Sequence, residues 1–300
     1  MQPQAFVTLT YPPHFLSTAA TIKSYFNHHP TLPVVVIVDD TNITRIPGCD
    51  IDFVEWPDYI SDCKELYGSL GQNCQIVRLS QTDLTPGKNK TLFPGWLGQQ
   101  MVKFYMDHLL SDLESWFFSD GDIFFFNTTP AATPYSYVSG YNPAWISYVA
   151  DTLKIDPVLV KHTAAVQTQD DITVSNPPWR LMSAAVLKGL RSYVEQIHSV
   201  DFIQYHLNYG KRLKGKLWEQ CTWSEWELIE LYQSRVLNQP TRLEFCPPMS
   251  FQQAIPTKNL PFTVSMLNLP KDLEMGRSWF ERTGVPVSDD HWQKASRIKK

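Results

Sequence analysis

The first half of the sequence alternates short apolar runs with longer amphipathic stretches, and this alternation constrains the fold more than any other feature. Residues 5–10 (AFVTLT) and 33–38 (PVVVIV) predict strands, and the second is the continuous apolar run expected of a strand buried on both faces. Residues 15–27 and 58–70 predict helices. We therefore predict an α/β fold with a mostly parallel, twisted sheet covered by helices.

The second half of the sequence is less regular and contains more proline, but it has no linker long enough to separate two domains. We therefore expect one domain over residues 1–300. The other predicted strands lie near 51–54, 75–79, 116–119, 123–126, 171–175, 241–245 and 262–267, and the other predicted helices near 96–111, 181–197, 224–237 and 271–283.

Composition narrows the classes of protein to which the chain can belong. Hydrophobic residues make up 43% and charged residues 19%, as in an ordinary globular chain. The net charge of -4 indicates no basic surface for nucleic acid, and no apolar run reaches the roughly 18 residues of a membrane helix. Five cysteines without CxxC spacing favour a reducing compartment, and no secretory signal is recognisable. We expect a soluble, cytoplasmic protein with no nucleic-acid partner and no integral membrane segment.

Two carboxylates, Asp120 and Asp122, interrupt the aromatic run WFFSDGDIFFFN. Taking an unpaired carboxylate out of water costs several kcal/mol, so something must compensate this pair. Because the two residues are two positions apart, their side chains share one side of an extended segment and can converge on a single cation. The alternative is a turn in which Asp120 binds its own backbone.

Polar residues also mark the ends of the first two predicted strands. Thr8 and Thr10 close the first strand, and Asp39 and Asp40 close the second. Sheets of this kind bind ligands at the carboxyl ends of their strands, where Asp120 is also expected. For Asp39 and Asp40, a turn that leads into the next residues is an equally good interpretation.

The helix predicted before the two carboxylates has a mixed face. In GWLGQQMVK, the residues Trp96, Gln100 and Lys103 are spaced at i, i+4 and i+7, which places them on one side of a helix. A face that belongs wholly to the core would not include a lysine without a partner. The alternatives are a ligand-facing side and a surface stripe.

Three segments, in this order, resemble one family of enzymes: GWLGQQMVK (95–103), WFFSDGDIFFF (116–126) and SEWELIELY (224–232). They resemble the nucleotide-sugar glycosyltransferases of GT-A fold, a Rossmann-like α/β arrangement, and are most similar to the DUF6492-like group. The resemblance covers about residues 5–245. It implies a donor-binding half over about 1–130 and an acceptor-binding half over about 131–300.

The resemblance implies a divalent metal, Mn²⁺ or Mg²⁺, held at the Asp-x-Asp motif. In the family pattern, Asp122 binds the metal directly, and Asp120 lies near the ribose or reaches the metal through water. Gly121 then allows close approach of the donor. Several related families recruit a late histidine as a further ligand, which makes His291 a candidate. Its alternative is the start of a helix at Asp289.

The implied donor is a nucleotide-sugar, with a UDP-sugar favoured, and the implied acceptor is a glycan or another hydroxyl compound. A metal bound by the carboxylates would neutralise the charge on the departing nucleoside diphosphate. Lys103 is expected to meet a phosphate as a point charge. The other expected donor contacts are Thr8, Thr10, Asp39, Asp40 and Gln100.

The segment TWSEWEL carries the candidates for a general base. By resemblance to inverting enzymes of this fold, Glu225 is the first candidate, with Glu227 and Asp171 behind it. Ser224 and Glu227 also have the spacing of a capping box, and so do Thr222 and Glu225, so the alternative for either glutamate is that it only satisfies a helix terminus. When Ser224 is the N-cap, Glu227 folds back on the helix start. In that arrangement Glu225 occupies the first helical position and is left to face the site.

Two other functions remain open. A non-catalytic glycan-binding or degenerate transferase module would retain the fold and the aromatic residues, which include ten Trp, but would need neither metal nor base. A metal-dependent phosphodiesterase also needs paired carboxylates, but it usually needs further acids or histidines at several strand ends, and the sequence lacks that cluster. Metal-dependent hydrolysis of one nucleotide-sugar would distinguish a transferase from both.

Overall fold

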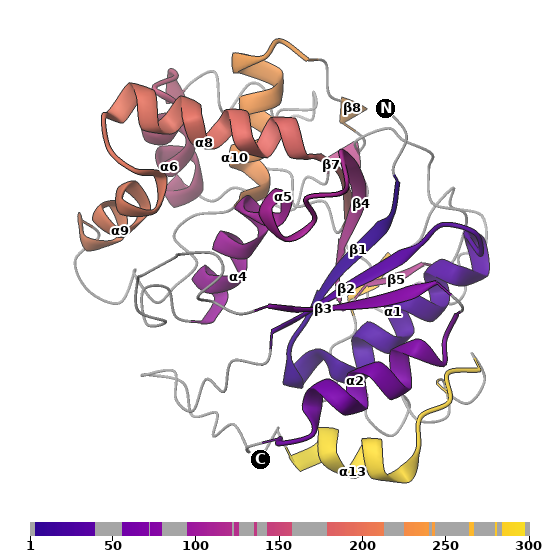
Figure 1. The fold of residues 1–300 in the computed structure, drawn as a ribbon. Helices are drawn as coiled ribbons and strands as arrows, with labels where there is room; N and C mark the ends of the chain where they lie inside the picture. Colours follow the sequence, from indigo (N-terminus) through magenta and orange to yellow (C-terminus); the bar gives the residue numbers. More distant parts are fainter. Residues whose placement is uncertain are drawn as a thin grey trace. The chain divides into compact units, whose positions relative to one another are not determined.

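A computed structural model of the chain shows helices and strands arranged as in an α/β protein (Figure 1). The residues that the structure describes are 4–39, 56–71, 73–79, 95–121, 123–125, 135–136, 143–157, 179–212, 225–239, 242–243, 264–266, 280 and 284–297.

Contacts within the chain group it into two compact units that are interleaved along the sequence. The first comprises Met1–Asp83, Ser115–Ala132 and Pro248–Lys300, and the second comprises Leu84–Glu114 and Thr133–Pro247. The prediction of one domain with a donor half and an acceptor half stays a prediction.

The first unit contains a parallel sheet. Strand β1 (Phe6–Thr10) lies between β2 (Val34–Asp39) and β4 (Ser115–Asp120), and β3 (Cys74–Leu79) pairs with β2. All three pairings are parallel. Every residue of β1 is buried, as expected for a central parallel strand that pairs along both edges and is covered on both faces. The predicted α/β fold with a mostly parallel sheet is therefore confirmed.

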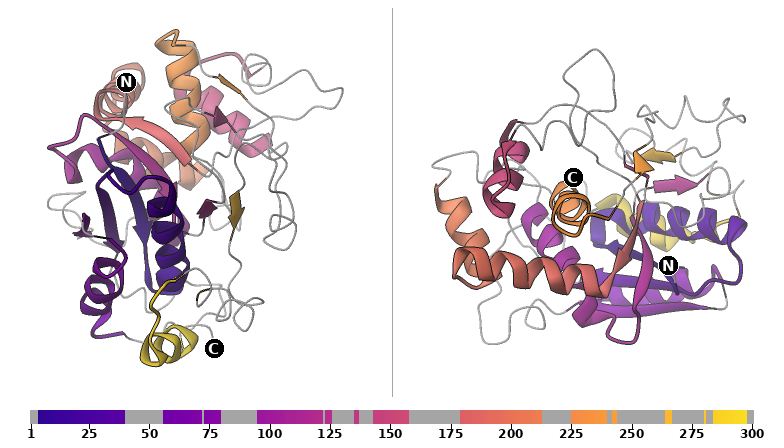
Figure 2. Two further views of the ribbon diagram at one scale, coloured as in Figure 1. Left: turned by 90° about the vertical axis from the view of Figure 1, so that its right-hand side faces the viewer. Right: turned by 90° about the horizontal axis from the view of Figure 1, so that it is seen from above.

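Helix α1 (Phe15–His28) begins soon after β1, because Pro12 opens a short 3-10 turn that ends the strand. The helix packs on the sheet, and Tyr25 stacks on Phe6 of β1 with ring centroids 3.9 Å apart. Helix α2 (Tyr59–Gly68) lies beside α1, as two of the views show (Figures 1 and 2).

Two further elements complete the described part of the first unit. Strand β5 (Ile123–Phe125) pairs in an antiparallel manner with β9 (Val264–Met266), and it lies against α1. Helix α13 (Asp289–Arg297) lies against α2, with Lys294 of α13 binding Asp62 of α2. The helix begins at Asp289, so the alternative interpretation of that stretch as a helix start is confirmed.

The second unit is mainly helical. Helix α10 (Glu225–Leu231) contacts α4 (Gly95–Phe104), α6 (Pro143–Leu153) and α8 (Ala184–His198). All seven residues of α10 are buried because neighbouring helices surround it. The other elements are α5 (Met106–Leu109), α9 (Phe202–Arg212), a π-helical turn (Tyr232–Val236), β7 (Trp179–Ser183), and the paired strands β6 (Tyr135–Ser136) and β8 (Arg242–Leu243).

An arginine ties α8 to α5 in this unit. Both terminal nitrogens of Arg191 bind the carboxylate of Asp107, at 2.7 and 2.6 Å, and one of them also binds the backbone oxygen of Phe104. The fork of the guanidinium matches the two carboxylate oxygens, which makes such a pair more specific than a single contact.

The predicted elements of the first half mostly match the structure. The predicted helix over 96–111 is two helices, α4 and α5, that are separated at Tyr105. Helices α6 and α9 and strands β6 and β7 were not predicted. The strands predicted near 51–54 and 171–175 lie outside the described residues, as does nearly all of the helix predicted near 271–283. Among the described residues, no helix is long and apolar enough to cross a membrane.

Candidate functional site

Asp120 is the last residue of β4 and lies at the carboxyl end of the sheet. It is in register with Leu9 of β1, and its side chain is half-buried. Asp39 ends β2, which pairs with β1 on the side opposite β4. The structure therefore brings the ends of β1, β2 and β4 to the same edge, as predicted. Asp40 and Asp122 lie outside the described residues.

Gly121 follows Asp120 and is packed against α1. A Cβ atom at this position would lie 2.4 Å from Thr18 Oγ1 and 2.7 Å from the backbone oxygen of Leu9. The Thr18 hydroxyl also donates to the Gly121 carbonyl oxygen at 3.1 Å. The glycine is thus required by the close approach of α1 to the turn after β4. The resemblance predicts that Gly121 allows close approach of the donor, but packing within the chain is by itself a sufficient reason for a glycine at this position.

The hydroxyl of Thr10 is used inside the core. It lies 2.9 Å from the Thr18 hydroxyl and 3.4 and 3.3 Å from the hydroxyls of Tyr59 and Tyr67. Burial raises the pKa of both tyrosines well above its usual range, so these hydroxyls stay protonated. The side chains of Thr8 and Thr10 are both fully buried. In this conformation neither hydroxyl is accessible to a nucleotide, and contact through the backbone of these residues stays a prediction.

A second cluster lies in the helical unit, where Lys103 and Glu225 form a buried ion pair. Lys103 Nζ lies 2.5 Å from Glu225 Oε1, and the side chains are 4% and 1% exposed. The ammonium also lies 4.7 Å from the centre of the Trp226 ring, within range of a cation–π contact. Gln100 accepts a hydrogen bond from the backbone N–H of Glu225 at 3.3 Å.

The cluster explains the mixed helix face of the sequence. Gln100 and Lys103 do lie on one side of α4, and both contact Glu225. Both side chains are buried, so the surface-stripe alternative is wrong for these two residues. The side-chain oxygen of Gln100 satisfies one of the N–H groups that a helix leaves unpaired at its start.

Glu225 is the first residue of α10, as predicted, but it does not face solvent. It is paired with Lys103, so its Oε1 already has a charged partner. Two further carboxylates of α10, Glu227 and Glu230, are also buried. Glu225 and Glu227 lie in the first turn of α10, where a helix stabilises negative charge. Ser224 and Asp171 lie outside the described residues.

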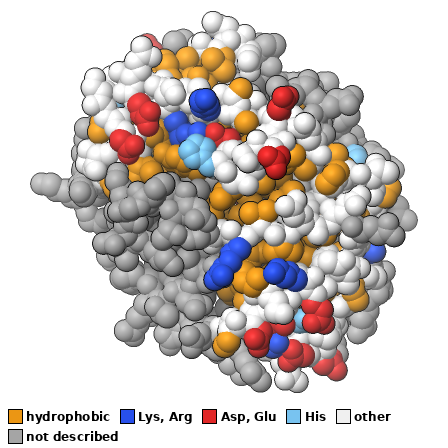
Figure 3. Space-filling model, in the orientation of Figure 1, with side chains coloured by type: hydrophobic (Ala, Val, Ile, Leu, Met, Phe, Trp, Pro, Cys, Tyr) orange, Lys and Arg blue, Asp and Glu red, His pale blue; other side chains and the backbone are white. Residues whose placement is uncertain are grey.

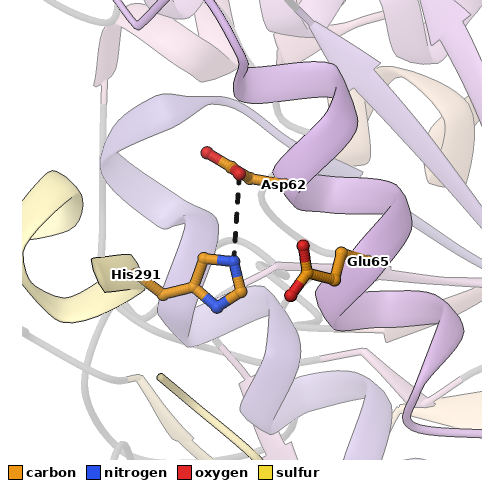
Figure 4. A group of neighbouring side chains, drawn as sticks. All are labelled: Asp62, Glu65 and His291. Carbon is orange, nitrogen blue, oxygen red and sulfur yellow. Dashed lines mark ion pairs between the residues drawn. The ribbon is translucent and has the colours of Figure 1, made fainter. Parts of the chain in front are cut away.

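A third cluster contains His291, which lies with Asp62 and Glu65 of α2 in the first unit (Figure 4). One potential ligand atom of each residue lies within 4.8 Å of the other two. The sequence prediction paired His291 with the Asp-x-Asp motif, and that pairing stays a prediction because Asp122 is outside the described residues.

Comparison with known proteins gives only remote similarities. No family model matches the sequence, and no curated protein matches it. The galactosyltransferase LgtC, solved in complex with donor and acceptor sugar analogues, is similar with a TM-score of 0.47 and 9% identity, over 97% of this chain and 99% of that chain. Core-mannan synthase A (CmsA/Ktr4) from Aspergillus fumigatus, solved in its Mn/GDP form, has a TM-score of 0.46 and 10% identity, over 76% of this chain and 68% of that chain.

The glycosyltransferase GlyE of Streptococcus pneumoniae has a TM-score of 0.40 and 10% identity, over 99% of this chain and 65% of that chain. Similarities at this level do not determine what a chain binds or which reaction it catalyses. Arguments about function therefore rest on the residues of this chain.

Several residues of these clusters were missed in the sequence. Asp62 and Glu65 are three positions apart, which is a signal for a shared helix face, but acids with this spacing are common on exposed helices. Thr18 gave no signal, because its contacts with Thr10 and Gly121 depend on how α1 packs. The sequence places Trp226 at a helix start but does not indicate its contact with Lys103.

Proposed function

We propose that this protein is a metal-dependent glycosyltransferase that moves a sugar from a nucleotide-sugar to a glycan or another hydroxyl acceptor. We favour a UDP-sugar donor and inversion at the anomeric carbon. The observation that carries the proposal is the position of Asp120, with Gly121 after it, at the carboxyl end of β4 in a parallel sheet. Sheets of this kind bind their ligands at that edge, and the three sequence segments resemble the same family.

The residues at this edge fit a hard divalent cation. Carboxylate oxygens are the ligands that Mg²⁺ and Mn²⁺ prefer, and the half-buried side chain of Asp120 retains access to solvent. We propose that Asp120 and Asp122 hold the metal, which when bound would neutralise charge on the departing nucleoside diphosphate. The turn that carries Asp120 is held by the contact between Thr18 and Gly121, which reduces its freedom to move.

Lys103 and Glu225 are paired with each other, and this pairing limits the roles that either residue can have in the reaction. An acceptor hydroxyl cannot reach a carboxylate that is 1% exposed unless the cluster opens. We retain Glu225 as the candidate base on the sequence resemblance, but the ion pair favours a role in which it positions Lys103. In the same way, Lys103 can meet a donor phosphate only if its ammonium turns from Glu225.

The metal proposal is tested by the variant Asp122→Asn in the full chain. Binding of UDP is measured by thermal shift and calorimetry, with and without Mn²⁺. The parent should be stabilised by UDP only when Mn²⁺ is present, by roughly 2.7 kcal/mol when the ligand is at about 100 times its dissociation constant. Asp122→Asn should abolish the metal-dependent part and most transfer.

Asp112→Asn is the matched control, since Asp112 is an exposed carboxylate outside the site, and it should behave like the parent. If Asp122→Asn binds UDP and Mn²⁺ as tightly as the parent, the metal assignment is wrong. Product analysis by NMR from an α-linked donor tests the stereochemistry, and an α-linked product would exclude inversion.

A further inference from the structure

We propose that Asp62, Glu65 and His291 form a second cation site, suited to Zn²⁺, that joins α13 to α2. The three side chains converge in the first unit, with the two acids projecting from α2 toward the histidine on α13 (Figure 4). Asp62 and Glu65 are three positions apart, so they lie one helical turn from each other on the same face. None of these residues belongs to the Asp-x-Asp motif, and the assignment of His291 to this site is an alternative to its predicted role as a further ligand at that motif.

The imidazole of His291 is the first argument for a ligand. The residue is 3% exposed, and its Nδ1 has no hydrogen-bond partner among the described residues. Its Nε2 lies 4.0 Å from Asp62 Oδ1, which is too far for a hydrogen bond. A buried polar group without a partner costs about 1–3 kcal/mol, and such a group is often explained by a bound ion or water. An ion between Nε2 and Asp62 would bind both of these atoms, whereas Nδ1 points in another direction and would need a different partner, such as water.

The carboxylate of Asp62 is held in a way that suits a metal ligand. Its Oδ2 accepts hydrogen bonds from Trp56 Nε1 at 2.5 Å and from Lys294 Nζ at 2.9 Å. Its Oδ1 faces His291 and has only a longer contact of 3.2 Å with Lys294 among the described residues. Hydrogen bonds to one oxygen fix the orientation of a carboxylate and leave the other oxygen to bind a cation.

The local charge also favours a cation. Lys294 is shared between Asp62 and Asp290, which it meets at 2.7 Å. Glu65, which is exposed, has no ion-pair partner among the described residues. Three carboxylates therefore lie near one ammonium. Acidic side chains gather at the lower end of the space-filling view, where α2 and α13 lie in Figure 1 (Figure 3).

The ligand set decides which cation the site suits. An imidazole with two carboxylates differs from the all-oxygen sites of Ca²⁺ and Mg²⁺, and imidazole nitrogen and carboxylate oxygen are both ligands that Zn²⁺ accepts. Three protein ligands leave a fourth position for water. The Phe15 ring lies edge-on to the imidazole, with centroids 5.4 Å apart, and helps to hold it in this orientation.

The test is a titration of the full, EDTA-treated chain with ZnCl₂ in the absence of nucleotide. Calorimetry should show Zn²⁺ binding, and the thermal midpoint should rise with added Zn²⁺. Glu65→Gln should weaken this binding at least tenfold, while Asp112→Asn should leave it unchanged. Co²⁺ serves as a spectroscopic probe, and its visible absorption in the parent should change in His291→Gln, because a nitrogen ligand is lost.

The background Asp120→Asn separates this site from the proposed donor metal, and Zn²⁺ binding to α2 and α13 should persist in it. The proposal is overturned if the parent binds no Zn²⁺ below millimolar concentration. It is also overturned if Glu65→Gln and His291→Gln both bind Zn²⁺ as the parent does.

Discussion

Replacing Lys103 alone should destabilise the chain far more than replacing Lys103 and Glu225 together. Lys103→Met removes the ammonium and leaves the Glu225 carboxylate, 1% exposed, without its charge partner. Glu225→Gln leaves the ammonium beside the Trp226 ring, 4.7 Å from its centre, which offsets part of the loss. We therefore expect the lysine variant to lose more stability than the glutamate variant.

The magnitude follows from the geometry of the pair. At 2.5 Å and an effective dielectric constant of about 20, the attraction between unit charges is about 7 kcal/mol. Desolvation of the two ions offsets several kcal/mol of this, so the net value of the intact pair is small. Removal of one partner from a buried pair costs about 3–5 kcal/mol, because the other charge stays buried. The double variant Lys103→Met/Glu225→Gln leaves neither charge, so its loss should be smaller than that of Lys103→Met alone and well below the sum of the single losses.

The assay is urea unfolding at pH 7, followed by tryptophan fluorescence, with the midpoint and slope fitted for the parent and the three variants. Lys294 and Asp290 form the control cycle, since they are an i,i+4 pair in which Asp290 is 66% exposed. Their coupling should stay below about 0.5 kcal/mol. The ion-pair account would be refuted if Lys103→Met and Glu225→Gln each lowered the unfolding free energy by less than about 1 kcal/mol. It would also be refuted if the loss in the double variant equalled the sum of the two single losses.

Two further predictions concern packing and pH. Gly121→Ala should cost about 1–3 kcal/mol of unfolding free energy, because a Cβ atom there would lie 2.4 Å from Thr18 Oγ1, whereas Gly68→Ala, with nothing within 4 Å, should be neutral or stabilising. Burial lowers the pKa of His206 from 6.5 to about 4, so the unfolded chain binds the proton first as the pH falls. The contribution of His206 to the unfolding free energy should therefore drop by about 3 kcal/mol between pH 6.5 and pH 4, and it should stay constant above pH 6.5. In urea unfolding, His206→Gln should remove this dependence of stability on pH, and His28→Gln should retain it. An equal pH dependence in the parent and in His206→Gln would contradict the account of His206. Equal losses of stability in Gly121→Ala and Gly68→Ala would contradict the account of Gly121.

The strands in the first half of the sequence could be predicted because a strand buried on both faces consists almost entirely of apolar residues. PVVVIV is apolar throughout, and β2 (Val34–Asp39) is a central strand that α/β packing covers on both sides. Helix α9 (Phe202–Arg212) was missed for the opposite reason. Its buried side includes His206 with Phe202, Tyr205 and Tyr209, and a histidine at a core position hides the helical period.

His206 is accommodated in that core by two hydrogen bonds that the sequence does not reveal. Its Nδ1 lies 2.8 Å from the backbone oxygen of Phe202, which can only accept, so Nδ1 carries the proton. Its Nε2 then accepts from the hydroxyl of Tyr148 at 2.6 Å. Tyr148 is on α6, far from α9 in the sequence, and no local rule links the two positions. A buried polar residue can therefore be recognised as core only once its partners are placed.

The same limit applies to Lys103 and Glu225, and it changes how their function must be tested. Each residue was assigned to a ligand from its own segment, but 122 positions separate them, and each is the other's partner. Loss of turnover in Glu225→Gln alone therefore does not identify a base. If Glu225 is the base, turnover should fall roughly 10²- to 10⁴-fold with nucleotide affinity near that of the parent.

If Glu225 instead positions Lys103, then Glu225→Gln and Lys103→Met should weaken donor binding by similar factors. The double variant should then bind no worse than either single variant, because both changes remove the same arrangement. The pH profile of kcat distinguishes the two roles independently, since only the loss of a base removes its acidic limb. Unchanged donor affinity and turnover in both single variants would show that the ion pair is a structural feature of α4 and α10 and has no part in the reaction.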